Sequence, residues 1–184
     1  MFVGWEGVGV CSYLLINFWY TRIAANKAAL KAMIMNRIAD VFFIIAILLI
    51  FNIFKTTDYI TVFNLLPFIL SENYIFLNIS FFKVSVITFF LFFGAIGKSA
   101  QISLHTWLPD AMEGPTPVSS LLHAATMVTA GVFLVIRCSI FFEYCESILF
   151  LLIIFGGITA IFAGITAIAH TTWRRLSPIQ LLAS

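Results

Sequence analysis

Long runs of apolar residues, separated by short polar stretches, dominate this chain. Five of them approach the length of a membrane-crossing helix, because about 20 residues are needed to cross a hydrocarbon core of roughly 30 Å. These runs cover approximately residues 2–20, 32–54, 84–108, 117–136 and 147–169. The pattern predicts an all-α, polytopic bundle of about five transmembrane helices, with residues 55–83 as a loop between the second and third.

A proline-rich stretch interrupts the helical pattern after the third run. It contains Pro109, Pro115 and Pro117 together with Gly114, and a regular helix cannot continue through such a sequence. Two interpretations stay open. The stretch is either an interfacial loop or a helix break that lines a hydrated cavity, since irregular backbone at membrane depth survives only there or inside protein.

Composition excludes a soluble domain and a nucleic-acid-binding protein. Hydrophobic residues make up 62% of the chain and charged residues 10%, whereas a soluble domain carries about 25% charged residues. The net charge is only +2, without a basic stripe. We expect Cys11, Cys138 and Cys145 to be free and buried. No metal-ligand spacing or glycine-rich nucleotide loop is found, so we expect no cofactor or metal on this chain.

Lys98 is the strongest candidate for chemistry, because it lies deep within the third apolar run. A lysine at such a depth reaches the interface poorly. Charges inside a membrane are costly and are usually paired or functional. A buried lysine beside a carboxylate can change its protonation state when its partner moves, as a proton pump requires. A static structural ion pair is the alternative.

Three other charges lie on the first two apolar runs. Glu6 is the predicted partner of Lys98, the alternative being an interfacial carboxylate. Arg37 and Asp40 are three residues apart and therefore share a helix face. We expect these two to form an ion pair with each other, in either a structural or a functional role.

Two histidines and a tryptophan complete the candidates. His123 lies on the fourth run and is either a satisfied core residue or a proton relay, since imidazole titrates near neutral pH. His105 and Trp107 precede the proline-rich stretch, and we interpret Trp107 as an interfacial anchor.

Several motifs closely resemble chain 5 of NADH:ubiquinone oxidoreductase, respiratory complex I. They read GWEGVG (4–9), SYLLINFW (12–19), KAMIMNR (31–37), HTWLPDAMEGPTPVS (105–119) and HAATMVTAG (123–131). A GKSAQ sequence at 97–101 belongs to the same similarity. The resemblance covers about residues 2–169 and is specific at nearly every motif position.

The resemblance implies a multi-pass, antiporter-like subunit of the mitochondrial inner membrane, which translocates protons while quinone is reduced elsewhere in the complex. In this family the acid matching Glu6 pairs with the lysine matching Lys98. The position of Asp40 is charged, that of His123 joins a central hydrophilic axis, and the lysine-bearing helix is interrupted. The implied partners are other membrane-arm subunits, lipid and protons. NADH, FMN, iron–sulfur clusters and ubiquinone would belong to other subunits.

Two departures from the family bear on the domain organisation. Family chains are several times longer, and residues 170–184 depart from the family pattern. We therefore expect residues 1–169 to be a partial antiporter-like, proton-translocating membrane domain. For residues 170–184 we expect an aberrant tail, from a frameshift or the end of a fragment.

Three functions stay open on these grounds. The leading one is a proton-translocating subunit of complex I, a translocase without redox chemistry on this chain. The second is the large subunit of a multi-subunit sodium/proton antiporter. The third is a partial product that does not pump.

Overall fold

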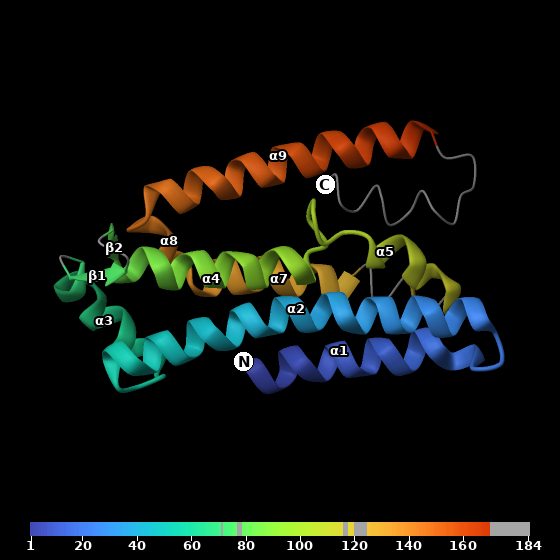
Figure 1. Cartoon of the computed structure of the whole chain (residues 1–184), viewed down its shortest axis with the longest axis horizontal. Coiled ribbons are helices and arrows are strands. Elements are labelled where there is room, and N and C mark those ends of the chain that lie inside the picture. The colour runs from blue at the N-terminus through green and yellow to red at the C-terminus, as the bar shows by residue number, and fades with distance from the viewer. Residues whose placement is uncertain (71, 77–78, 116–117, 120–124, 170–184) are drawn as a thin grey trace.

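The chain forms an elongated helical bundle with one small hairpin (Figure 1). A computed structural model describes residues 1–70, 72–76, 79–115, 118–119 and 125–169. The α-helices are α1 (Phe2–Ile16), α2 (Ile23–Phe54), α3 (Tyr59–Ile69), α4 (Lys83–Lys98), α5 (Trp107–Asp110), α7 (Val128–Arg137), α8 (Ser139–Glu143) and α9 (Glu146–Ala169). Two short 3₁₀ helices, η1 (Asn17–Trp19) and η2 (Ala111–Glu113), and two strands, β1 (Asn73–Phe76) and β2 (Ile79–Phe82), complete the described elements.

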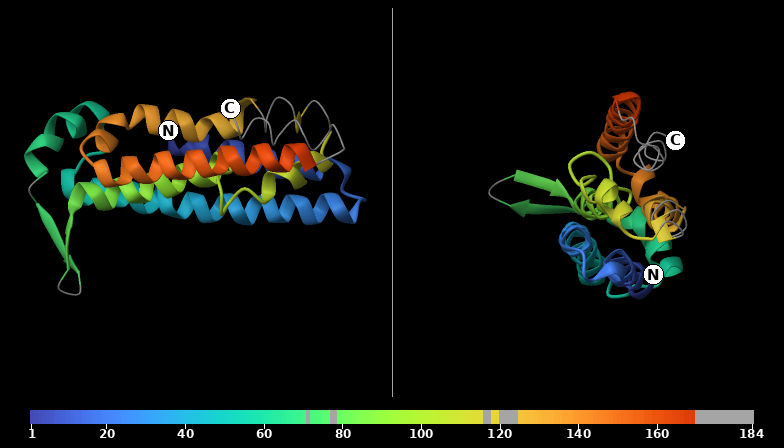
Figure 2. Two further views of the ribbon diagram at one scale, coloured as in Figure 1. Left: turned by 90° about the horizontal axis from the view of Figure 1, so that it is seen from above. Right: turned by 90° about the vertical axis from the view of Figure 1, so that its right-hand side faces the viewer.

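The bundle has three levels, with α4 in the middle. Figure 1 shows α1 and α2 side by side below, α4 and α7 at the centre and α9 above, and the end-on view in Figure 2 agrees. The apolar core is centred on α4, where Ile87, Leu91, Phe92 and Ile96 are all at most 1% exposed. The predicted all-α bundle is confirmed.

The first two apolar runs form an antiparallel pair of helices. The second helix, α2, begins at Ile23, earlier than the predicted start at residue 32. Its first turns carry Ala25, Ala28, Ala29 and Ala32, all buried. Alanine is the strongest helix former, so these turns are helical although two lysines interrupt the apolar pattern. The helices Ile23–Phe54 and Glu146–Thr166 are long and apolar enough to span a membrane.

The predicted loop at residues 55–83 contains regular structure. Helix α3 is followed by the antiparallel hairpin β1–β2, with Asn73 opposite Phe82. An ion pair of 2.6 Å between Lys83 Nζ and Glu72 Oε2 joins the two ends of this hairpin. The hairpin projects sideways from the bundle (Figure 2). Such a short two-stranded element gives little pattern in a sequence, which explains why it was not predicted.

The lysine-bearing helix α4 ends at Lys98, earlier than expected. Its end is a Schellman motif, in which Gln101 N–H donates to Ile96 O and Ala100 N–H donates to Gly97 O. Ala100 has φ 50°, in the left-handed region that usually belongs to glycine at this position. The chain therefore leaves the helix immediately after Lys98.

The predicted site of the helix break is accordingly wrong. Pro109 lies within the short helix α5, and Pro115 follows η2, while Pro117 lies outside the described residues. The interruption begins instead at residue 99. The next residue, Ala100, has a glycine-like conformation, and an alanine in the sequence does not predict such a turn. The expectation that the lysine-bearing helix is interrupted is confirmed, at a different residue.

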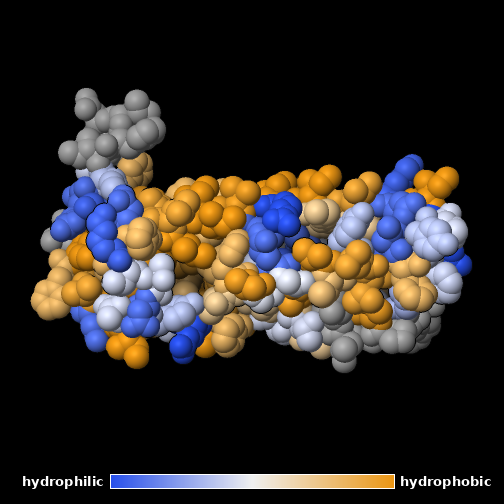
Figure 3. All heavy atoms as spheres, turned by 90° about the horizontal axis from the view of Figure 1, so that it is seen from below, coloured by the Kyte–Doolittle hydropathy of each residue, from blue (hydrophilic) through white to orange (hydrophobic). Residues whose placement is uncertain are grey.

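The cysteines agree with the prediction in part. All three are free, and Cys138 and Cys145 are buried, but Cys11 is exposed on α1. Apolar surface is plentiful on this chain, and the face seen in Figure 3 is mostly hydrophobic, with hydrophilic residues near its middle and towards both ends.

Candidate functional site

Lys98 lies at the centre of the bundle and is almost completely buried. Its side chain is 1% exposed and that of Asp40 is 5% exposed, and Lys98 Nζ lies 3.5 Å from Asp40 Oδ1. Trp5 of α1 donates a hydrogen bond of 2.7 Å from Nε1 to the same oxygen. The Lys98 amine also lies 5.6 Å from the centre of the Trp5 ring, within the range of a cation–π interaction.

Small residues let three neighbouring helices approach the end of α4 closely. A Cβ at Gly97 would overlap Ala39 of α2, and one at Gly9 of α1 would lie 3.0 Å from Lys98 Nζ. On the remaining side a Cβ at Gly131 of α7 would overlap Ser99. Close backbone approach of this kind is typical of helix contacts in membranes. It places the Lys98 amine between α1 and α2.

Glu6 forms an ion pair with a different residue. Its Oε1 accepts a hydrogen bond of 2.9 Å from Arg37 NH1, and the two side chains are 27% and 48% exposed. The predicted Glu6–Lys98 and Arg37–Asp40 pairings are therefore both wrong. Arg37 and Asp40 do share a face of α2, as predicted, but that face meets α1 and α4, and each charge finds its partner on another helix.

A small cavity lies beside the two ion pairs. It has a volume of about 30 Å³, which is room for about two water molecules at roughly 10–15 Å³ each. Residues from α1 and α2 line it: Glu6, Gly9, Val10, Tyr13, Met33, Asn36, Arg37 and Asp40. Asn36 is 3% exposed, and neither its side-chain oxygen nor its nitrogen has a hydrogen-bond partner among the described residues.

The interrupted segment after α4 is held by polar contacts at two places. Trp107 is fully buried and donates from Nε1 to Gly97 O at 3.2 Å, so its prediction as an interfacial anchor is wrong. Asp110 of α5 forms an ion pair of 2.6 Å with Lys31 of α2. His105 packs against the Phe162 ring of α9, with centroids 5.1 Å apart.

Sequence reasoning missed Trp5, Gly9 and Asn36. Trp5 and Asn36 stand directly beside the selected charges Glu6 and Arg37. Asn36 is also four residues before Asp40, on the same helix face, and an amide there in an apolar helix was the available signal. Gly9 gave no such signal, because its role depends on a side chain from another helix. His123 lies outside the described residues.

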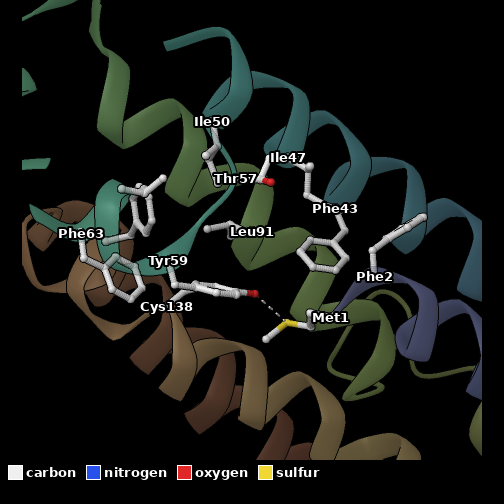
Figure 4. A pocket seen from close by; sticks show the side chains of 12 residues that line it. Met1, Phe2, Phe43, Ile47, Ile50, Thr57, Tyr59, Phe63, Leu91 and Cys138 are labelled. Carbon is white, nitrogen blue, oxygen red and sulfur yellow. Dashed lines mark hydrogen bonds between the residues drawn. The ribbon is translucent and has the colours of Figure 1, made fainter. Parts of the chain in front are cut away.

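A larger cavity lies farther along the bundle and is different in character. It has a volume of about 240 Å³ and is lined mainly by apolar side chains of α1, α2, α3, α4 and the α7–α8 region. Figure 4 shows aromatic rings of Phe43, Tyr59 and Phe63 around it, with Tyr59 donating to Met1 Sδ. The described residues contain no group of three or more metal-ligating side chains.

The amino-acid sequence is similar to a known family of membrane proteins. Residues 1–177 match the family model described as NADH:quinone oxidoreductase/Mrp antiporter, transmembrane. NADH-ubiquinone oxidoreductase chain 5 of Chondrus crispus is 56% identical over 176 residues, which are 96% of this chain and 26% of that protein. The Acanthamoeba castellanii protein of the same name is 60% identical over 165 residues, or 89% of this chain and 24% of its own length.

Solved structures show the same fold. The Mrp complex from a Dietzia species superposes with a TM-score of 0.81 at 27% identity, covering 99% of this chain and 19% of that one. The chain spans about a quarter of the length of the curated relatives it matches. Family match, sequence identity and fold agree, and the chain belongs to the NADH:quinone oxidoreductase/Mrp antiporter family of membrane proteins.

Proposed function

We propose that this chain is part of a proton-translocating membrane-arm subunit of NADH:ubiquinone oxidoreductase, and that Lys98 is its proton-exchanging group. The observation that carries the proposal is the ion pair between Lys98 and Asp40, at 1% and 5% side-chain exposure between helices. The high identity to curated chain 5 proteins supports this assignment over a sodium/proton antiporter.

The geometry suits a group that exchanges protons. An ammonium in apolar surroundings is held charged by a nearby carboxylate, and neutralising or withdrawing that carboxylate favours release of the proton. Asp40 Oδ1 is the nearby acceptor, and Trp5 holds it in place by a hydrogen bond. Lys98 ends its helix at the interruption, so its amine can move without unwinding a continuous helix.

We expect the remaining parts of this function on other chains. The mitochondrial inner membrane is the expected location, and other membrane-arm subunits are the expected partners. Redox cofactors and ubiquinone are expected on those other subunits. This chain would contribute charge movement alone, driven by quinone reduction elsewhere in the complex.

Substitution of Lys98 in the full-length subunit tests the proposal. Lys98→Met keeps the length and most of the volume but removes the amine, so we expect NADH-driven proton uptake by vesicles to fall by at least about tenfold. Lys83→Met is the matched control, because Lys83 lies at the opposite end of the same helix and pairs with Glu72 of the hairpin. Proton uptake at the wild-type level in an assembled Lys98→Met complex would contradict the proposal. Uptake that requires sodium but not NADH would favour the antiporter instead.

A further inference from the structure

Asn36 is a buried amide that the proposed proton exchange at Lys98 does not use. It lies on α2, one residue before Arg37 and four before Asp40. At 3% exposure it cannot reach bulk solvent, and the described residues offer its oxygen and its nitrogen no hydrogen bond. Buried polar groups are nearly always satisfied, by protein or by ordered water. The amide therefore needs a small partner that can reach it inside the protein.

The nearest described space is the cavity of about 30 Å³, which Asn36 lines together with four other residues that carry polar side chains. A site holds ordered water when it has room for about 10–15 Å³ per molecule and two to four polar partners. The cavity meets both conditions, because Glu6, Arg37 and Asp40 line it together with Asn36 and Tyr13. The amide can both donate and accept, and the carboxylates can accept.

The cavity also joins the two ion pairs. Glu6 pairs with Arg37 at one side, with side chains that are 27% and 48% exposed. Asp40 pairs with the buried amine of Lys98 at the other. Glu6 and Asp40, the acids of the two pairs, line the same cavity, so water inside it would be able to accept a proton from one carboxyl group and pass one to the other.

We propose that Asn36 holds water between the Glu6–Arg37 and Asp40–Lys98 ion pairs, and that this water carries protons between Glu6 and Asp40. The inference rests on the proposed function, since it concerns the same exchange at Lys98. It assigns the Glu6 carboxyl, which does not contact Lys98, a route to the lysine through solvent. Asn36 is then a positioning residue, acting through the water that it binds.

The test compares three variants of the full-length subunit in the intact complex. Asn36→Leu keeps the side-chain size and removes both polar atoms. Asn36→Ser keeps a group that can bond to water. Asn52→Leu is the matched control, because it makes the same change on an exposed position of the same helix. Assembly of each is checked by native gel, and the Asn36→Ser variant keeps the test valid if Asn36→Leu does not assemble.

Two measurements are made on each assembled complex. A high-resolution map is expected to show solvent density within hydrogen-bond distance of Asn36 and Asp40 in the wild type and in Asn36→Ser, and none in Asn36→Leu. NADH-driven proton uptake is expected to fall by about tenfold in Asn36→Leu, by less in Asn36→Ser, and not in Asn52→Leu.

The outcomes separate this inference from the proposed function. Absence of solvent density at the wild-type Asn36, or undiminished proton uptake in an assembled Asn36→Leu complex, overturns the inference even when Lys98→Met abolishes pumping. An equal loss of proton uptake in assembled Asn36→Ser and Asn36→Leu also overturns the inference, because only the serine variant keeps a side chain that can bind water. If Lys98→Met pumps normally, the proposed function fails instead, while the density still decides whether Asn36 binds water.

Discussion

At the scale of single residues, the site depends on which charges meet and on how little space surrounds them. The amine of Lys98 has Asp40 as its ion-pair partner and the ring of Trp5 beside it. Burying a charge without a partner would cost several kcal/mol, so the Asp40 carboxylate is what makes this position tolerable for a lysine. Gly9 completes the arrangement by leaving room for the amine.

Gly9→Ala is expected to impair proton translocation, although it adds only a methyl group. The new Cβ would lie 3.0 Å from Lys98 Nζ, so the amine must shift and its approach to Asp40 must change. We expect NADH-driven proton uptake to fall several-fold, on the order of 1 kcal/mol in the barrier. Gly7→Ala, two residues away with no described atom within 4 Å of its Cβ, is the control. Equal effects of the two substitutions would show that helix propensity rather than contact with Lys98 is responsible.

At the scale of the elements, the important event is the end of α4 immediately after Lys98. The Schellman motif satisfies the last carbonyls, and Trp107 adds a third contact by donating to Gly97 O. This frees the lysine from the constraints of a helix interior while its own backbone remains satisfied. The proline-rich stretch, which the sequence predicted as the break, lies beyond this turn and contributes to α5 and η2.

Ala100 is the residue whose substitution tests this element. With φ 50°, an alanine is strained there by about 1 kcal/mol relative to glycine. Ala100→Gly is therefore expected to stabilise the turn, whereas Ala100→Val is expected to destabilise it by about 1–3 kcal/mol. Amide hydrogen exchange of residues 96–106 in the intact complex measures both. Slower exchange in Ala100→Val than in Ala100→Gly would be incompatible with a left-handed residue at this position.

At the scale of the whole molecule, the fold is a bundle whose surface is largely apolar. Large hydrophobic side chains are exposed along α1, α2 and α9, among them Leu14, Leu48, Phe150 and Ile161, each at least 60% exposed. Soluble proteins rarely expose so much contiguous apolar surface. Lipid covers such surfaces in membrane proteins, which agrees with the family to which the chain belongs.

The expressed chain is therefore expected to stay in the membrane fraction when membranes are washed with alkaline carbonate. Peripheral proteins held by charge are released by this treatment, whereas apolar helices within the bilayer are not, since their transfer to water is unfavourable. Immunoblotting of the pellet and supernatant measures the distribution, with a known peripheral protein as the control. Recovery of the chain in the supernatant would contradict its placement within the bilayer.

Much of the fold follows from local pattern. Apolar runs of sufficient length predict membrane helices because a bilayer requires internally satisfied backbone. Four runs overlap α1, α2, α4 and α9, although α2 begins earlier and α4 ends earlier than predicted. The hairpin and α3 were missed, because short elements with mixed polarity resemble a loop. Lys98 was selected correctly as a buried charge, since its depth in an apolar run is visible without a structure.

What the sequence by itself determined, then, is the class of the protein and its set of costly charges, because both depend on the composition of single segments. Only the tertiary structure decided that Asp40 rather than Glu6 pairs with Lys98, and that Asn36 lines a cavity between two ion pairs. The physical reason is that such pairings depend on how helices cross. Here the crossing is set by the contact of Gly97 with Ala39, a contact between distant segments that neither segment specifies alone.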